Sequence, residues 1–572
     1  MRIAITGIGA ISAIGRNCAE TLQSLLNEQS GIGSMRVLGS VHKELPVGEV
    51  PFSDAELKQM AGIDLSEPMP RTALLGLLAA REAMQQSGLQ HTDRCTFISG
   101  TTVGGMDLTE QHLHHYAQGQ ALDHIRLHEA DSTTRTIATH LSPFAFTATP
   151  STACSSALNA VLLGANMLRT GQAKAAVVGG AESLSKFHLN GFNTLMILSH
   201  EPCRPFDANR NGLNLGEGAG YLVLEREEDA KIRGAVILGY ISGYANTCDA
   251  YHQTASSENG EGAYLAMKGA LEMAGLTPGD IDYINAHGTA TPNNDLSESA
   301  ALRRLFGSQM PAVSSTKAFT GHTTSASGGL EAAICVLAMQ HGFIPANLHW
   351  SETAEGLVQP VLHTEHKPLH HVLCNAFGFG GNESSLVLSQ AGTDLSETAL
   401  PSSLTPIATI EELDDSAVSQ MVSGAEARRM TPQMRRIVAA ARMVLQQTGI
   451  TPDAILCETE WGCMAQSMRF LQDMLDNDEQ QLKPTPFIQS THNTVASLIA
   501  ILTGNHGYNA TYARHPLSPS AAMMDIRTQM ALGQIRSALV LQFDEQVESW
   551  DRVLAQVGEQ MTPIAHAYIY KV

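Results

Sequence analysis

Three side chains in this sequence have the types and settings needed for acyl transfer. Cys154 lies in the small-residue segment Ser-Thr-Ala-Cys-Ser-Ser, and His287 and His322 each open a loop rich in Gly and Thr far downstream. A thiolate is a nucleophile, and imidazoles can donate or accept protons beside it. The trio suits carbon–carbon bond formation in which one thioester acylates the sulfur and a second, decarboxylating thioester supplies the carbanion.

The setting of Cys154 predicts a sharp turn between a strand and a helix. Small residues surround the cysteine, and the apolar helical pattern Leu158–Leu168 follows it. A helix N-terminus at this point would lower the thiol pKa and present free backbone N–H groups. Taken alone, Cys154 fits a buried structural thiol better than a nucleophile, and each histidine fits a core residue as well as a catalytic one, but their combination favours a reactive site.

The surrounding sequence alternates between short apolar runs and helical patterns. Helices are predicted over Thr72–Ser87 and Ala157–Thr170, with Gly88 and Gly171 at the positions of C-terminal caps. Strands are predicted at the N-terminus and over the runs Ala175–Val178, Gly220–Glu225, Ile281–Ala286 and Ser385–Ser389. This alternation indicates an α/β fold whose strands are buried on both faces.

Composition indicates a large globular protein. With 572 residues, 43% of them hydrophobic and 16% charged, the chain should form two or more domains. The net charge of −21 argues against nucleic acid and anionic membrane as partners. Nine cysteines without paired spacing favour a reducing compartment, and no apolar run approaches 18 residues. We therefore expect a cytoplasmic protein without membrane insertion.

The last third of the chain resembles an earlier part. Residues 393–406 are rich in Ser, Thr, Pro and Glu and predict a linker. Beyond it, residues 440–450 repeat the pattern of residues 79–89, and Gly533-Gln534 repeats Gly171-Gln172 at nearly the same offset. We infer a partial duplication of the first lobe. The copy has Pro516 where Cys154 would fall, so it should lack the nucleophile, and Cys457 and Cys463 should be structural.

The motifs of residues 1–391 resemble those of the β-ketoacyl-acyl-carrier-protein synthases of the thiolase-like superfamily. Five groups occur in the family's order: Thr152–Ser156; Arg204–Asp207 with Gly216–Gly220; His287–Pro292 with Asp295 and Glu298; Ser315–Lys317 with Gly321, His322 and Glu331; and Asn375–Asn382. The resemblance implies a thiolase-like α/β fold, layered αβαβα, with an additional C-terminal thiolase-like half lobe. The domains would be 1–235 and 236–391 for the two ketosynthase lobes, 392–406 for the linker and 407–572 for the half domain.

The resemblance also implies a role for each catalytic residue. Cys154 would accept the acyl chain from the phosphopantetheine arm of an acyl carrier protein, and the backbone N–H groups of Cys154 and Phe379 would form the oxyanion hole. His287 and His322 would donate hydrogen bonds to the malonyl thioester oxygen while CO2 leaves. The pair of histidines fits a decarboxylating elongation enzyme better than a priming synthase or a thiolase.

Five residues would support these steps. Lys317 would pair with Glu331 and hold His322 in its useful tautomer. Thr289 and Thr291 would bind the pantetheine arm. Phe379, between two glycines, would be the gate between the acyl pocket and the malonyl entry, although an ordinary core aromatic is the alternative. The chain would hold no cofactor and no metal of its own, because the partner carries the phosphopantetheine.

The C-terminal half domain resembles non-catalytic chain-length factors through Ser490–Asn493 and Gly504–Asn509. We expect it to dock on the ketosynthase lobes and shape the tunnel or partner choice; a stabilising appendage is the alternative. The likeness extends to type II polyketide synthases of aryl-polyene type, with fatty-acid biosynthesis as the second candidate. The chain itself would be a homodimer, or a heterodimer with a second ketosynthase-like chain. A non-catalytic chain-length-factor-like or scaffold subunit is the other class of function.

Three other features carry less weight. Gly7-Ile8-Gly9 lacks the third glycine of a dinucleotide fingerprint, and the histidine tracts 112–115 and 366–371 lack carboxylates or cysteines at ligand spacing. The sequence departs from the family pattern at two places: Ser325–Gly328 replaces a small Gly-Ala-Ala-Gly run, and Asn382 replaces Thr. We expect these departures to alter the shape of the pocket more than the type of reaction.

Overall fold

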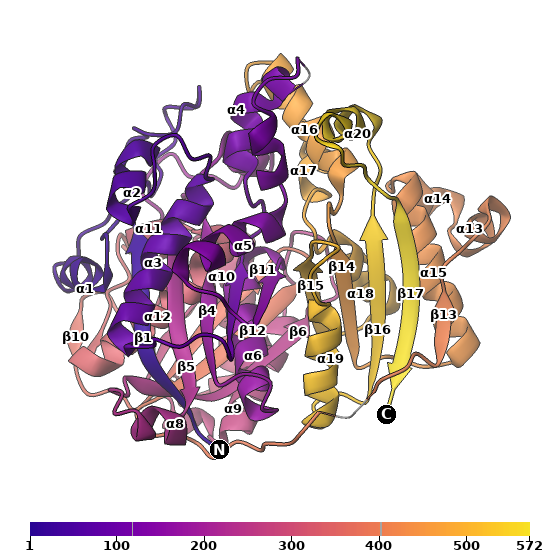
Figure 1. Cartoon of the computed structure of the whole chain (residues 1–572). Coiled ribbons are helices and arrows are strands. Elements are labelled where there is room, and N and C mark those ends of the chain that lie inside the picture. The colour runs from indigo at the N-terminus through magenta and orange to yellow at the C-terminus, as the bar shows by residue number, and fades with distance from the viewer. Residues whose placement is uncertain (117, 401–402) are drawn as a thin grey trace.

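The computed structural model describes residues 1–116, 118–400 and 403–572, and within them fifteen strands form one continuous sheet (Figure 1). The strands fall into three consecutive groups. The first, in spatial order, is β3 (Phe146–Pro150), β2 (Cys95–Gly100), β4 (Ala175–Glu182), β5 (Gly218–Arg226) and β1 (Ile3–Ser12). The second is β6 (Gly239–Cys248), β12 (Asn382–Ser389), β11 (His371–Gly378), β7 (Tyr283–Asn285) and β8 (Ala312–Ser314). The predicted strands all lie in these two groups, and the α/β thiolase-like class is confirmed.

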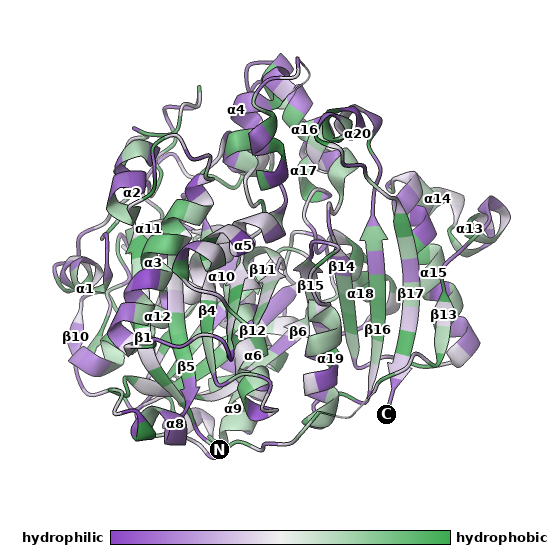
Figure 2. Cartoon of the chain, viewed as in Figure 1, coloured by the Kyte–Doolittle hydropathy of each residue, from purple (hydrophilic) through white to green (hydrophobic). Residues whose placement is uncertain are grey.

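Helices cover both faces of the first two groups. Helix α3 (Arg71–Ser87) packs on β1 and β5, and α9 (Glu261–Ala274) packs on β6 and β12. Between them, α6 (Ser156–Arg169) contacts β4 and α12 (Ser327–His341) contacts both β5 and β11. The order of layers is therefore αβαβα, as the family resemblance implied. Strands and inner helices are the most hydrophobic parts of the chain (Figure 2).

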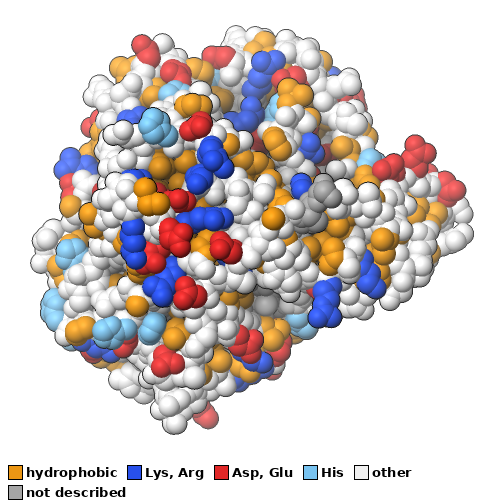
Figure 3. Space-filling view, turned by 60° about the horizontal axis from the view of Figure 1, so that its bottom comes forward, with side chains coloured by type: hydrophobic (Ala, Val, Ile, Leu, Met, Phe, Trp, Pro, Cys, Tyr) orange, Lys and Arg blue, Asp and Glu red, His pale blue; other side chains and the backbone are white. Residues whose placement is uncertain are grey.

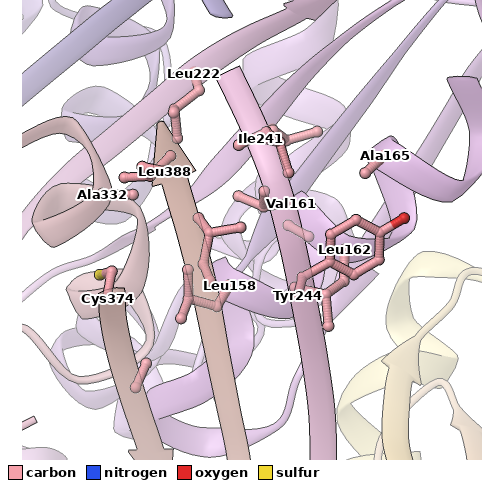
Figure 4. Close-up of a cluster of buried hydrophobic side chains, with 14 of the residues drawn as sticks. Leu158, Val161, Leu162, Ala165, Leu222, Ile241, Tyr244, Ala332, Cys374 and Leu388 are labelled. Atoms are coloured by element: carbon pink, nitrogen blue, oxygen red, sulfur yellow. The ribbon is translucent and has the colours of Figure 1, made fainter. Parts of the chain in front are cut away.

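The central layer holds the main hydrophobic core. Leu158, Val161 and Leu162 of α6 belong to one buried cluster with Ile241 and Tyr244 of β6 (Figure 4). All five side chains are buried. Burial of this apolar surface stabilises the layer that carries the residues following Cys154.

The third group of strands repeats the first. Its spatial order is β15 (Tyr508–Ala513), β14 (Ala454–Thr459), β16 (Ser537–Asp544), β17 (Ile564–Lys571) and β13 (Ala408–Ile410), which matches β3, β2, β4, β5 and β1 strand for strand. Helix α15 (Pro432–Thr448) packs on β17 and, like α3, spans 17 residues and ends at a left-handed glycine, Gly449 in place of Gly88. The predicted duplication of the first lobe is confirmed.

The copied lobe joins the first lobe edge to edge. Strand β15 pairs antiparallel with β3, with Tyr512 opposite Pro150 and Ala513 opposite Thr149 (Figure 1). The backbone N–H of Ser151 also donates to the Thr511 carbonyl at 2.8 Å. This contact places the third lobe directly beside the segment that carries Cys154.

Residues 390–407 contain no helix or strand in their described part, while residues 401 and 402 of the predicted linker lie outside the described residues. The predicted lobe boundary at 235 falls between α8 (Glu227–Ile232) and β6. Gly7 and Gly9 lie in β1, where added Cβ atoms would fall 2.0 and 1.9 Å from α3 carbonyl oxygens, so close packing requires glycine there.

No helix in the described part of the chain is long and apolar enough to cross a membrane. The same residues contain no group of three His, Cys, Asp or Glu side chains placed to hold a metal ion. On the face that carries the two chain ends, acidic and basic side chains are intermixed (Figure 3).

Candidate active site

Cys154 lies at a tight turn between β3 and α6, as predicted. A single 3-10 turn, Ala153–Ser155, connects the two elements, and the preceding Ala153 has a left-handed backbone with φ of +54°. This conformation is costly for residues with larger side chains. The Ser156 hydroxyl fixes the turn because it donates to the Ala153 carbonyl at 2.7 Å and accepts from the Thr152 N–H at 2.9 Å.

The structure brings Cys154, His287 and His322 into one buried site. Nε2 of His322 lies 3.1 Å from the Cys154 Sγ. The His287 ring meets the His322 ring edge-on, with centroids 5.3 Å apart and planes at 82°. The three residues are 5%, 3% and 2% exposed. Residues separated by 168 positions along the chain therefore share one reaction volume.

Burial sets the protonation states in this site. Burial, followed by the charge of Lys317, lowers the pKa of both histidines well below its ordinary value, so both rings are neutral at pH 7. Burial raises the pKa of the Cys154 thiol to about 12, although Lys317 and the Phe379 backbone act in the opposite direction. The predicted lowering of the thiol pKa at the helix N-terminus is wrong, because desolvation of the thiolate is the larger effect.

The predicted pair of Lys317 and Glu331 is present, with Nζ and Oε1 2.6 Å apart and both side chains buried. Lys317 does not hold His322, however. Nδ1 of His322 instead contacts the hydroxyl of Ser327 at 3.0 Å, and that hydroxyl also lies 3.2 Å from the Thr323 hydroxyl. Ser327 belongs to the departure from the family pattern, so that departure places a hydroxyl against a catalytic imidazole.

Two carboxylates hold the loop of His287. Glu298 accepts from the backbone N–H groups of His287 and Gly288 at 2.9 and 2.8 Å. Asp295 accepts from the Ala290 N–H at 3.1 Å, where the backbone is left-handed. Nδ1 of His287 has no hydrogen-bond partner among the described residues. An unpaired buried nitrogen beside a thiol is typical of a site that binds a substrate.

Phe379 lies where the two approaches to Cys154 meet. Its backbone N–H is hydrogen-bonded to the thiol and lowers the thiol pKa, which places it where an oxyanion-hole donor is needed. Its ring stacks on Phe192, with centroids 5.5 Å apart and planes at 19°. The preceding glycine, Gly378, allows close approach, since a Cβ there would lie 2.8 Å from the Thr152 carbonyl oxygen.

Two cavities meet at Cys154 and Phe379. The wider one, of about 400 Å³, is lined by both histidines and by Thr289 and Thr291, whose hydroxyls are 2.8 Å apart. The predicted pantetheine-binding threonines therefore lie in the cavity that contains the catalytic histidines. The second cavity is a narrow slot of about 50 Å³ that extends away from the histidines.

The third lobe forms one wall of the slot and also supports the catalytic residues. Trp461, Phe487 and His492 are among its lining residues. The Asn493 side chain donates to the Phe379 carbonyl at 2.9 Å, and His492 Nδ1 lies 3.1 Å from the Ser151 hydroxyl. The third lobe therefore docks beside the slot, as predicted. The contact is made by Ser490–Asn493, the segment that resembles chain-length factors.

Other departures and cysteines also have structural explanations. The Asn382 side chain donates to the Asn509 carbonyl at 2.6 Å, so the residue in place of Thr joins the second lobe to the third. Ser325 donates to Glu182 at 2.6 Å. Cys457 and Cys463 are buried in the third lobe, and burial raises their pKa well above the ordinary thiol value, in agreement with structural roles.

Family models match almost the whole chain in three segments. The model described as Beta-ketoacyl synthase, N-terminal domain, matches residues 1–230, and Beta-ketoacyl synthase, C-terminal domain, matches residues 238–351. A second model with the N-terminal description matches residues 405–571. The repeat of the N-terminal description agrees with the repeat of strand order.

Individual proteins show the same likeness. The 3-oxoacyl-[acyl-carrier-protein] synthase 2 of Vibrio harveyi is 33% identical over 68% of this chain and 98% of its own length, and that of Vibrio cholerae is 34% identical over 68% and 99%. A ketosynthase in complex with its chain length factor from Xenorhabdus doucetiae is 32% identical, with a TM-score of 0.59 over 68% of this chain and 98% of that one.

One solved structure matches all three lobes. A protein titled keto synthase-chain length factor covers 100% of this chain and 78% of its own with a TM-score of 0.78. At 19% identity it shows the fold alone. The fold of the whole chain, including the third lobe, therefore has a counterpart in a solved structure.

Proposed function

This chain belongs to the β-ketoacyl synthase family, and we propose that its Cys154, His287 and His322 perform a decarboxylative condensation in the cavity they share. The enzyme is a β-ketoacyl-acyl-carrier-protein synthase, an acyltransferase that joins an acyl thioester to malonyl-acyl-carrier protein. The observation that carries the assignment of residues is the 3.1 Å contact between the Cys154 sulfur and His322, with His287 beside it.

The first step is acyl transfer to sulfur. Cys154 attacks the thioester carbonyl of the incoming acyl-carrier protein, and Nε2 of His322 takes the thiol proton, which a pKa of about 12 would otherwise retain. The N–H groups of Cys154 and Phe379 stabilise the tetrahedral oxyanion. The carbon–sulfur bond to the carrier then breaks, and the departing pantetheine thiolate takes the proton from His322.

The second step is condensation. Malonyl-acyl-carrier protein enters the wider cavity, where Thr289 and Thr291 bind its pantetheine arm. As CO2 leaves, His287 and His322 donate hydrogen bonds to the thioester oxygen and stabilise the enolate. The enolate carbon attacks the acyl carbonyl on Cys154, a carbon–carbon bond forms, and the carbon–sulfur bond to Cys154 breaks. The cysteine thiolate then takes one proton from solvent water, which balances the loss of CO2 from the malonyl carboxylate.

The partner and cofactor assignments follow from this chemistry. The acyl carrier protein is the partner, and its phosphopantetheine is the only prosthetic group the reaction requires, so the chain needs no metal or cofactor. The third lobe covers the β3 edge of the catalytic lobes. We propose that it replaces, within one chain, the second ketosynthase-like subunit predicted from the sequence, and that any dimer uses another face. Light scattering of the full chain tests this: a dimer broken by a change at the β3–β15 seam would contradict it.

The pathway is proposed to be type II polyketide synthesis of aryl-polyene type, in the cytoplasm. Aromatic residues line the slot, among them Phe187, Phe192 and Phe487, and flat unsaturated chains stack well on such walls. Fatty-acid synthesis remains the second candidate, favoured by the names of the curated relatives. Competition between saturated and polyunsaturated acyl-carrier thioesters of equal length distinguishes the two.

The assignment of Cys154 is tested by mass spectrometry. Incubation with acyl-carrier thioester should add one acyl group to the peptide that contains Cys154, and Cys154→Ala should abolish it. A protein that binds the carrier but gains no acyl group would instead be the non-catalytic scaffold considered from the sequence.

A further inference from the structure

The slot that begins at Cys154 contains polar groups that the condensation does not use. Apolar side chains, including Met106 and Phe187, line much of it. Glu129 from the first lobe and Glu460 and Trp461 from the third lobe also line it. Glu129 also lines a second cavity, which is open to the surface and is not lined by Cys154. This polar group therefore lies at the end of the slot away from the sulfur.

Two of these groups are buried without hydrogen-bond partners. Trp461 is 5% exposed, and its Nε1 has no partner among the described residues. Glu129 is also 5% exposed; its Oε2 forms an ion pair with the Arg135 guanidinium at 3.5 Å but accepts no hydrogen bond. Folded proteins rarely leave buried donors and acceptors without hydrogen bonds, so a donor and an acceptor on two residues that line one slot indicate a missing ligand group.

The charge of this region restricts which group can bind there. Burial, together with the neighbouring Glu460, raises the pKa of Glu129 to about 8, and burial raises that of Glu460 to about 7. Both carboxyl groups are therefore partly protonated near neutral pH. A carboxylate on the ligand would be repelled by them, and a methyl end would leave the indole N–H and the carboxyl unpaired.

We propose that this end of the slot recognises a hydroxyl group at the far end of the acyl chain. A hydroxyl satisfies both orphan groups at once: its oxygen accepts from the Trp461 N–H, and its hydrogen is donated to the Glu129 carboxyl. The aromatic walls would accommodate a phenol as well as an aliphatic alcohol. The inference rests on the proposed function, in which the acyl chain is attached to Cys154 and extends into the slot.

The test compares matched acyl-carrier thioesters in the full-length enzyme. Pairs of equal length that end in methyl or hydroxyl, aliphatic and aryl, compete for condensation with malonyl-carrier protein. We expect the hydroxyl-ended chain to be favoured at least tenfold in kcat/KM at one length. Trp461→Phe and Glu129→Met should each reduce this preference to below about threefold, mainly by slowing the hydroxyl-ended chain.

Trp550→Phe is the matched control. Its indole nitrogen is also buried without a partner, and its ring packs against His128, 5.1 Å away, but it is not among the residues that line the slot. This variant should keep the wild-type preference. Equal rates for methyl-ended and hydroxyl-ended chains at every length, or a preference unchanged in both slot variants, would overturn the inference.

The same experiment separates this inference from the proposed function. If methyl-ended and hydroxyl-ended chains acylate Cys154 and condense equally well, only the hydroxyl recognition fails. If no chain acylates Cys154 in the wild-type enzyme, the proposed function fails and the inference fails with it.

Discussion

Replacing Ser327 by Ala removes the hydrogen-bond partner of a catalytic imidazole. The Ser327 hydroxyl lies 3.0 Å from Nδ1 of His322, whose Nε2 faces the Cys154 sulfur. When the hydroxyl donates to Nδ1, the ring proton stays on Nε2, where it can stabilise the enolate. When it accepts from Nδ1, Nε2 is free to take the thiol proton. A serine hydroxyl can fill both roles, and alanine can fill neither.

The size of the effect follows from burial. Ser327→Ala leaves Nδ1 of a 2% exposed histidine without this partner, which costs about 1–3 kcal/mol. At 1.36 kcal/mol per tenfold change, the rate of condensation should fall about 5- to 150-fold. Because the hydroxyl does not line the malonyl cavity, the change should appear mainly in kcat, with KM for malonyl-carrier protein nearly unchanged.

Rapid-quench measurements separate the two chemical steps. Acylation of Cys154 is followed by intact-protein mass spectrometry, and decarboxylation by release of labelled CO2 from malonyl-carrier protein. Ser325→Ala is the control, since Ser325 lies in the same buried turn but donates to Glu182 instead of His322. A Ser327→Ala enzyme with wild-type rates in both steps, or a Ser325→Ala enzyme equally impaired, would refute the reasoning.

Four further outcomes are expected. Lys317→Met leaves Glu331 as an unpaired buried carboxyl and should lower the free energy of unfolding by about 3–5 kcal/mol in denaturant titrations; a loss below about 1 kcal/mol contradicts this. Asn493→Ala should slow Cys154 acylation by about 5- to 30-fold in quench assays, because it frees the Phe379 carbonyl; an unchanged rate argues against support by the third lobe. Alkylation of Cys154 by iodoacetamide should rise with pH without a plateau up to pH 10, since its pKa is about 12; a plateau near pH 8 contradicts this. Glu129 has a pKa of about 8 in the folded protein against an ordinary 4.5, so its contribution to stability is complete below pH 4 and is lost as the pH rises to 8. Glu129→Gln should therefore reduce the fall in the free energy of unfolding between pH 4 and pH 8 by about 1–3 kcal/mol. An unchanged dependence of the free energy of unfolding on pH would contradict this.

The reacting trio could be predicted because its signals are local. The small residues around Cys154 and the Gly-rich loops at His287 and His322 each mark a backbone that must turn sharply at a strand end. The pairing of Lys317 with Glu331 follows similarly, since a lysine in a buried motif requires a counter-charge. Such requirements can be recognised from short stretches of sequence.

The duplicated lobe and its docking on the ketosynthase lobes were predicted from the sequence, but its edge-to-edge pairing with β3 was not. Residues 79–89 and 440–450 match because both end the same kind of amphipathic helix before a glycine cap. Strand β15 pairs with β3 through backbone hydrogen bonds, which impose few demands on side-chain type. Edge pairing of this kind therefore has little effect on which residue types occur in the paired strands.

The thiol pKa and the polar end of the slot depend on tertiary packing. The helix-terminus argument for Cys154 omitted the cost of desolvation, which depends on neighbours from several lobes. Glu129 and Trp461 come from different lobes and share no motif. Ser327 did give a signal, as a departure from a run of small residues, but its contact with His322 requires the turn at the start of α12.

The central claim is that Cys154, His287 and His322 act on one thioester in one cavity. The most direct measurement is a single-turnover reaction with acyl- and malonyl-carrier proteins, in which the acyl group on Cys154 and the condensed product are followed together by mass spectrometry. In the wild-type enzyme the Cys154 adduct should form and then disappear as product forms. In His287→Ala it should form and persist, with product formation slowed about 100-fold or more. Product formation at the wild-type rate in that variant, or an adduct on another residue, would contradict the claim.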